Sequence, residues 1–154
     1  MSVKIIAFKD EYTKDFSELN FAWLDKYFYI EDYDREVLTK PLEYIIGKGG
    51  HIFLAQLNNE IIGTVALINR GEKEGFELSK MAVSEDHQGK KIGQQLMDFC
   101  INFAKEKGAT RIYLDSNTKL PPALNLYRKV GFKEIPVPKD TPYERCNIRM
   151  EMYL

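Results

Sequence analysis

Apolar residues follow two different spacings along this chain, and the two spacings alternate. Segments in which apolar and polar residues take turns predict half-buried strands, because successive strand side chains point to opposite faces. Segments in which apolar residues recur every three or four positions predict amphipathic helices. The predicted strands are 3–8, 51–57, 60–68, 76–83, 111–115, 132–135 and 147–154. The predicted helices begin near Tyr12, after Asp34 as the N-cap, at Gly93 and near Pro122.

Turn residues between these segments indicate how the segments connect. Asn58 and Asn59 separate two strands by two residues, which predicts a β-hairpin. Gly108 and Gly131 follow the last two helices and are expected to end them. The sequence contains no internal repeat, low-complexity tract or linker. These features predict one domain over residues 1–154, of mixed α/β or α+β class.

Composition narrows the function classes. Hydrophobic residues make up 44% of the chain and charged residues 29%, as in ordinary globular domains. The net charge of −1 gives no electrostatic case for nucleic acid or an anionic membrane surface. No segment has the apolar run of a signal peptide or a membrane span, so a cytoplasmic protein is expected. Cys100 and Cys146 predict buried thiols, and the spacing of His51 and His87 predicts no zinc site.

Residues Val83 to Gly93, reading VSEDHQGKKIG, lead from a predicted strand through a glycine-containing loop into a predicted helix. The first N–H groups of a helix lack partners within the helix, and the helix dipole is positive there, so such a loop can bind an anion. Lys90 and Lys91 add positive charge at an end where acidic residues usually stabilise a helix. Together these features predict a site for a phosphate-bearing ligand.

The spacing of this loop separates it from two common phosphate sites. Neither GxGxxG nor GxxxxGK followed by Ser or Thr is present, which excludes the dinucleotide fingerprint and the P-loop. The loop instead resembles the (Gln/Arg)-x-x-Gly-x-(Gly/Ala) signature of acyl-CoA N-acyltransferases. Gln88, Lys91 and Gly93 stand at its defining positions, with Lys91 in place of the usual central glycine. Downstream, ALNLYRKVGF at 123–132 resembles the second signature of the same family, a tyrosine on a short helix before a Gly-Phe turn. Both motifs in this order resemble the GCN5-related N-acetyltransferase (GNAT) superfamily.

The resemblance implies a fold and an acyl donor. The fold would be a single GNAT-like domain with a central, mixed, mostly antiparallel twisted sheet of about six to seven strands and about four helices. The donor would be acetyl-CoA, bound as a co-substrate without a metal. The residues implied to bind it lie on a strand edge, in the loop and after a later strand. They are Met81, Ala82, Val83, Gln88, Gly89, Lys90, Lys91, Ile92, Gly93, Gln94 and Asn117.

The resemblance also implies catalytic roles. Tyr127 matches the family tyrosine that commonly protonates the CoA thiolate or holds its sulfur, and a phenol of pKa about 10 is protonated at neutral pH. A core tyrosine is the alternative. Glu77 occupies the strand position where some members place a general base, on the same predicted face as Met81; a solvated carboxylate is the alternative. Asn117 is implied to hydrogen-bond the pantetheine or acetyl region, and a cap or turn role is the alternative. Leu120 stands where many relatives have an asparagine, so Asn117 would act from a shifted position.

The acceptor side carries less information. Phe28, Tyr29 and Glu31 link the first two predicted helices, where family members often build the substrate pocket, and Tyr143 precedes the last strand. Acidic and aromatic residues suit a cationic amine, and equally an ordinary solvated loop. The expected activity is acetylation of a primary amine of a small molecule, peptide or protein. Transfer of a longer acyl group and an acyl-CoA sensor without turnover are alternatives. Family members often dimerise, so a homodimer is an expectation.

Overall fold

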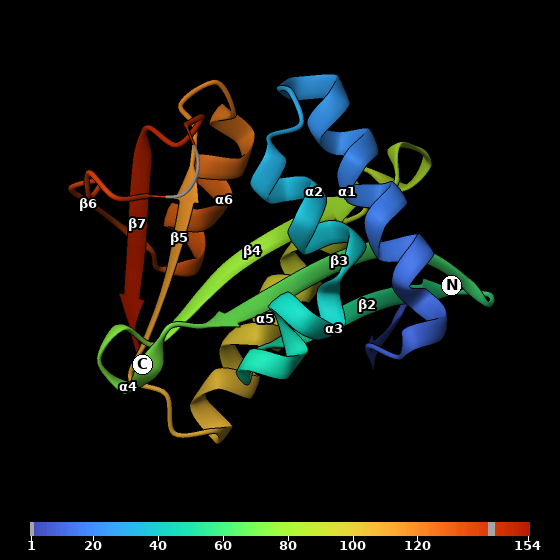
Figure 1. Ribbon diagram of the computed structural model, residues 1–154, viewed down its shortest axis with the longest axis horizontal. Helices are drawn as coiled ribbons and strands as arrows, with labels where there is room; N and C mark the ends of the chain where they lie inside the picture. Colours follow the sequence, from blue (N-terminus) through green and yellow to red (C-terminus); the bar gives the residue numbers. More distant parts are fainter. Residues whose placement is uncertain (1, 142–143) are drawn as a thin grey trace.

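The computed structural model of the protein describes residues 2–141 and 144–154. Its strands form a seven-stranded sheet in the order β1-β2-β3-β4-β5-β7-β6 (Figure 1). Neighbouring strands are antiparallel except for the parallel pair β4 and β5, which confirms the predicted mixed, mostly antiparallel sheet. The strands are β1 (Lys4–Ala7), β2 (His51–Leu57), β3 (Glu60–Asn69), β4 (Phe76–Val83), β5 (Arg111–Ser116), β6 (Lys133–Ile135) and β7 (Ile148–Tyr153).

Helices cover both faces of the sheet (Figure 1). The first face carries α1 (Thr13–Tyr27), α2 (Asp32–Thr39) and α3 (Pro41–Tyr44). The opposite face carries α5 (Ile92–Glu106) and α6 (Pro121–Val130). The short α4 (Gly71–Glu74) joins β3 to β4, and 3₁₀ turns occur at Asp10–Tyr12, Ile46–Lys48 and Glu85–His87.

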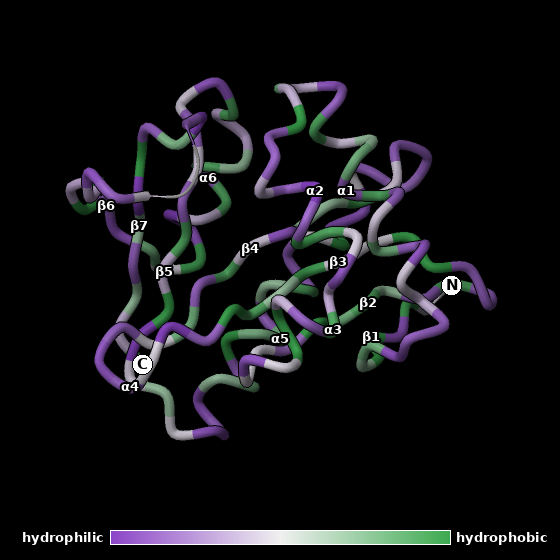
Figure 2. Tube along the Cα trace, in the orientation of Figure 1, coloured by the Kyte–Doolittle hydropathy of each residue, from purple (hydrophilic) through white to green (hydrophobic). Residues whose placement is uncertain are grey.

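Each face of the sheet has its own hydrophobic core. Phe16 and Leu38 are fully buried beneath α1–α3, and Leu96 is fully buried beneath α5. Figure 2 shows hydrophobic residues along the central strands and hydrophilic ones in most connecting loops. Cys100 lies in the α5 core as predicted, whereas Cys146 is only half-buried. In the described part of the chain, no helix is both long and apolar enough to cross a bilayer.

The predicted hairpin is confirmed at the turn between β2 and β3. Asn58 has a φ of 50° and Asn59 a φ of 68°. Two consecutive left-handed residues match the right-handed twist of the flanking strands, and asparagine tolerates this conformation better than most residues. The turn therefore fixes how β2 and β3 are paired.

The start of the second helix differs from the prediction. Asp34 is not the N-cap; Glu31 is, and Asp34 is the third helical residue. The two side chains form a capping box, in which the Asp34 Oδ2 accepts a hydrogen bond from the Glu31 backbone N–H at 3.0 Å. Pro41 does not kink this helix, because the helix ends at Thr39 and Pro41 begins α3, where a missing N–H costs no hydrogen bond.

The parallel strands β4 and β5 diverge soon after they meet. In the described sheet they pair at two positions, Phe76 with Ile112 and Glu77 with Tyr113. Beyond Glu77 the edge of β4 that faces β5 has no strand beside it, and Figure 1 shows the two strands separating. The backbone groups along this edge lack sheet partners, so the edge can accept an extended ligand as a further strand.

A β-bulge interrupts the alternation of β4. Thr64 pairs with Ala82 but Ala66 pairs with Ser79, so two residues of β4 stand opposite one of β3. Lys80, at the bulge, has a left-handed φ of 53°. Because the extra residue reverses the alternation, Met81 packs in the same core as Leu78, and Glu77 faces the other side of the sheet. The prediction that Glu77 and Met81 share a face is therefore wrong.

Candidate functional site

Two adjoining pockets open where β4 and β5 diverge. The first, of about 100 Å³, is lined from α1, β4, β5, α6 and the segment before β7. The second, of about 380 Å³, is lined by the end of β4, the following loop and the start of α5. Trp23 and Met81 line both pockets, so the two lie side by side. The open edge of β4 runs along them from one to the other.

The second pocket contains the loop that the sequence singled out. Nearly all of the predicted donor-binding residues of this loop and strand end line it, namely Met81, Ala82, Val83, Gln88, Gly89, Lys91, Ile92, Gly93 and Gln94. Lys90 is exposed and lies outside the lining. His87, which the sequence analysis did not select, also lines this pocket, and its buried Nδ1 has no hydrogen-bond partner among the described residues.

The start of α5 has the properties of an anion site. Its N-cap residue, Lys91, makes no side-chain capping bond, and the first turn contains no acidic residue. The first amides of this 15-residue helix are therefore not capped by its N-cap side chain, at the positive end of the helix dipole. A Cβ added to Gly89 or Gly93 would meet no atom within 4 Å, so protein packing does not require these glycines. The residues present fit a phosphate group that approaches the backbone closely.

Lys91 has a left-handed backbone, with a φ of 61°. This conformation favours glycine, which explains why the matching position of the signature usually carries one. Lys91 keeps the backbone shape of the signature at the cost of a locally unfavourable φ. The loop is also held by Gln88, whose Nε2 donates to the Val83 carbonyl at 3.4 Å.

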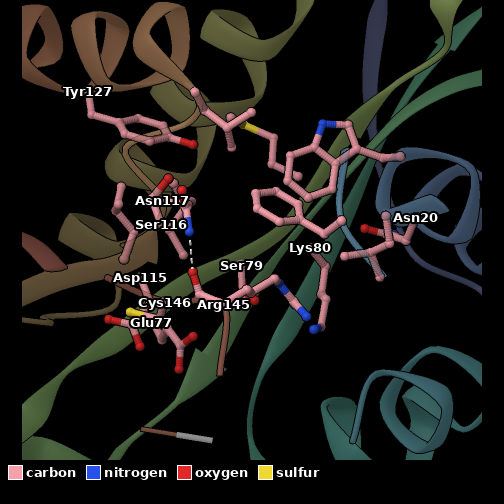
Figure 3. Close-up of a pocket in the computed structure, with 17 residues that line it drawn as sticks. Asn20, Glu77, Ser79, Lys80, Asp115, Ser116, Asn117, Tyr127, Arg145 and Cys146 are labelled. Atoms are coloured by element: carbon pink, nitrogen blue, oxygen red, sulfur yellow. Dashed lines mark hydrogen bonds between the residues drawn. The ribbon is translucent and has the colours of Figure 1, made fainter. Parts of the chain in front are cut away.

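Tyr127 lies on α6, and its hydroxyl points into the first pocket (Figure 3). Its ring packs edge-on against Phe132, with 6.3 Å between the centroids. Burial raises the pKa of Tyr127 to about 12, opposed by a smaller effect of a hydrogen bond with Ser116. The phenol is therefore protonated at neutral pH, and it combines the core contact of the alternative interpretation with access to the pocket.

Glu77 is not a solvated carboxylate. Its side chain is 2% exposed, and its Oε1 accepts hydrogen bonds from Arg70 Nε at 3.0 Å, Arg70 Nη2 at 2.7 Å and the Tyr113 hydroxyl at 3.3 Å. The bonds in the described structure all go to Oε1, and Glu77 lines the first pocket. Figure 3 shows Glu77 and Tyr127 well separated in this pocket. A direct proton exchange between them does not fit this arrangement.

Asn117 lines the first pocket, but its amide is already engaged. Its Nδ2 donates to the Arg145 carbonyl at 2.6 Å, drawn as a dashed line in Figure 3, and its Oδ1 accepts from the Lys119 backbone N–H at 2.8 Å. The second bond is the local turn that the sequence left open as an alternative. The first holds the segment before β7 against the end of β5.

An ion cluster that the sequence analysis did not predict closes the first pocket on the side of α2. Asp34 is fully buried and accepts bonds from Arg145 Nη1 at 2.7 Å and Nη2 at 2.9 Å, and from Lys80 Nζ at 3.3 Å. Arg145 also bonds Glu31 at 2.7 Å. Burial by itself raises the pKa of Asp34, but Arg145 and Lys80 outweigh it and lower that pKa below its usual value. Glu31 therefore serves as a partner of Arg145.

The remaining predicted acceptor residues differ in whether they line the first pocket. Phe28 lines the first pocket together with Trp23 and Leu24. Tyr29 is 54% exposed, and its hydroxyl donates to Glu144 at 2.8 Å outside the lining. Tyr143 lies outside the described residues. The bulky apolar residues at the end of α1 could have indicated Trp23 as a lining residue, whereas no local signal indicates Arg145.

Comparison with known proteins agrees with the two motifs. The model of the acetyltransferase (GNAT) family matches residues 7–132, and the chain therefore belongs to this family. An acetyltransferase of the GNAT family from Staphylococcus aureus Mu50 superposes with a TM-score of 0.88 at 26% identity, over 99% of both chains. A GNAT family acetyltransferase from Elizabethkingia anophelis, solved with acetyl-CoA bound, has a TM-score of 0.72 at 25% identity, over 99% of this chain and 98% of the other.

Curated relatives match over a shorter span. N-acetyltransferase 8B of Rattus norvegicus is 28% identical over 105 residues, which are 66% of this chain and 46% of the relative. The chain spans about half the length of the curated relatives it matches.

Proposed function

We propose that the protein transfers the acetyl group of acetyl-CoA directly to a primary amine. The observation that carries this proposal is the path that the two adjoining pockets form along the open edge of β4. It begins at the uncapped start of α5 and ends at the Tyr127 hydroxyl. A ligand with a phosphate at one end, an extended amide-containing arm and a thioester at the other end fits this path.

Each part of the site has a proposed role in holding the donor. The backbone amides from Gln88 to Gln94 bind the pyrophosphate, and Lys91 contributes charge. Met81, Ala82 and Val83 offer main-chain hydrogen bonds to the pantetheine arm, as in strand addition. Asn117 supports the pocket through its bond to the Arg145 carbonyl.

Tyr127 stabilises the departing thiolate as a hydrogen-bond donor. An ordinary thiol has a pKa of about 8.5, against about 12 for this phenol. Complete transfer of the phenolic proton to the thiolate would cost about 5 kcal/mol at about 1.4 kcal/mol per pKa unit. The phenol therefore lowers the charge on sulfur while largely keeping its proton. The proton that completes CoA-SH comes in net terms from the amine, which loses one when R–NH2 becomes the amide.

Glu77 is the proposed base for that amine proton. Because Arg70 and Tyr113 hold its Oε1, proton transfer would use Oε2, with a water molecule as the relay. The two hydrogen bonds from Arg70 fix the position of this carboxylate.

The test combines acetyl-CoA binding by calorimetry with CoA-thiol release across amines. We expect Tyr127→Phe to lower kcat about 100-fold, the effect of losing one positioned donor, with acetyl-CoA affinity nearly unchanged. Tyr153→Phe, at an exposed tyrosine on β7, is the matched control and should behave as wild type. Full activity of Tyr127→Phe would reject the role of Tyr127. Acetyl-CoA binding without thiol release from any amine class would favour the sensor alternative.

A further inference from the structure

The charges that line the first pocket cancel one another. Four charged side chains line it, the carboxylates Glu77 and Asp115 and the cations Lys80 and Arg145. Each carboxylate has an arginine of its own: Glu77 is paired with Arg70 at 2.7 Å, and Asp115 with Arg149 at 2.6 Å. Among the described residues that line the pocket, every carboxylate is already in an ion pair.

The cations of the pocket are balanced in the same way. Lys80 and Arg145 both bond the fully buried Asp34, and Arg145 also bonds Glu31. At the rim, Lys119 Nζ lies 6.0 Å from the centroid of the Phe28 ring, and Glu144 is exposed beside Tyr29. These two rim charges also have opposite signs. Among the described residues, the lining and these two nearby charges together carry no excess of either sign.

The rest of the lining is mostly apolar. The side chains with large apolar groups are Trp23, Leu24, Phe28, Leu78, Met81, Leu114, Leu120 and Tyr127. The Trp23 and Phe28 rings contact each other, with 5.6 Å between their centroids. Uncharged polar groups are contributed by Asn20, Ser79, Ser116 and Asn117. A lining of this kind stabilises an apolar group of a ligand. It offers few interactions that compensate the free energy lost when a charged group is desolvated.

We propose that the acceptor is a primary monoamine with an apolar body and no other charged group. This inference rests on the proposed acetyl transfer. A second ammonium, as in polyamines and aminoglycosides, would be desolvated without a free carboxylate and would approach Lys80 and Arg145. A carboxylate on the acceptor would meet cations whose bonds already go to Asp34 and Glu31. Burial in an uncharged pocket also favours the free base of the reacting amine, the form that attacks the thioester.

Three amines of equal chain length test this proposal: hexylamine, 1,6-diaminohexane and 6-aminohexanoate. We measure CoA-thiol release with saturating acetyl-CoA and compare kcat/KM. Hexylamine is expected to exceed each of the other two by about tenfold or more, because burying an unpaired charge is costly. A kcat/KM for 1,6-diaminohexane or 6-aminohexanoate equal to that of hexylamine would overturn the monoamine assignment while leaving acetyl transfer intact. No turnover of any of the three, while another amine class is acetylated, would overturn this inference and leave the proposed transfer intact. No turnover of any amine class, with normal acetyl-CoA binding, would overturn both.

Variants at the rim provide a second test. Lys119→Glu changes the charge beside Phe28 without removing a side chain of the lining. It should raise kcat/KM for 1,6-diaminohexane relative to hexylamine about threefold or more, since it adds a carboxylate that the second ammonium can reach. Lys119→Met is the matched uncharged control, and its ratio should lie between those of wild type and Lys119→Glu. An unchanged ratio in both variants would contradict charge-based selection of the acceptor.

Discussion

Replacing Asp34 by asparagine is expected to lower the free energy of unfolding by about 3–5 kcal/mol. Asp34 is fully buried and accepts three bonds from Arg145 and Lys80, at 2.7, 2.9 and 3.3 Å. The substitution keeps the shape of the side chain but leaves the buried Lys80 and the partly buried Arg145 short of a negative charge. Breaking a buried ion pair in this way is more costly than deleting both partners, because the remaining charge is left uncompensated.

The measurement is urea denaturation at neutral pH, with thermal unfolding as a second readout. For a domain of this size, 1 kcal/mol corresponds to about 2–4 °C in Tm, so the variant should melt roughly 6–20 °C below wild type. Asp32→Asn is the matched control, because Asp32 is exposed in the first turn of the same helix. That control should change stability by a few tenths of a kcal/mol.

The pH dependence gives an independent check. The folded pKa of Asp34 is lowered, so its stabilising contribution is present above the unfolded value near 3.9 and is lost as the pH falls through the lower folded value. The stability difference between wild type and Asp34→Asn should therefore narrow in strong acid. An Asp34→Asn protein as stable as Asp32→Asn at pH 7 would refute the reasoning.

Two further predictions concern the aromatic core and the loop. Burial among Phe53, Phe76 and Phe103, and to a lesser extent Lys107, lowers the pKa of His51, so wild type should lose stability as the pH falls below about 6.5. His51→Gln should show a smaller loss of Tm between pH 7 and 5, and an identical loss would contradict this. Lys91→Gly removes a side chain from a left-handed residue and should raise stability by up to about 1 kcal/mol, whereas Lys90→Gly should lower it. Equal effects of the two glycine substitutions in urea denaturation would contradict this explanation.

Periodicity recovered most elements because burial on one face dictates it. The strands around Asn58 and Asn59 and the helix that ends before Gly108 were predicted with nearly correct bounds. The bulge at Lys80 was not, since nothing in a lysine indicates a positive φ. That one residue moved Glu77 to the face opposite Met81. Local patterns show which residues are apolar, and they do not show where a strand gains a residue.

The candidate site divides in the same way. The loop from Gln88 to Gln94 is a local structure, and its spacing was sufficient to place it at a helix start. The first pocket is built from residues far apart in sequence, and Arg145 meets Asp34 across 111 positions. Charged residues that pair over such a distance do not produce a periodic pattern in the sequence. The sequence analysis therefore interpreted the acidic residues near Glu31 as suited to a cationic amine. The fold instead uses Glu31 and Asp34 to hold an arginine.

The divergence of β4 and β5 divides the sheet into two parts. One part is β1–β4 and the other is β5–β7, and two paired positions between β4 and β5 join them. Asp34 lies on α2, which packs over the first part, and it binds Arg145, which precedes β7 of the second part. This ion pair therefore links the two parts across the open side. The Asp34–Arg145 ion pair therefore contributes to how far apart the two parts lie at the first pocket. Substitutions at Asp34 or Arg145 are therefore expected to alter the first pocket without replacing any residue that lines the second.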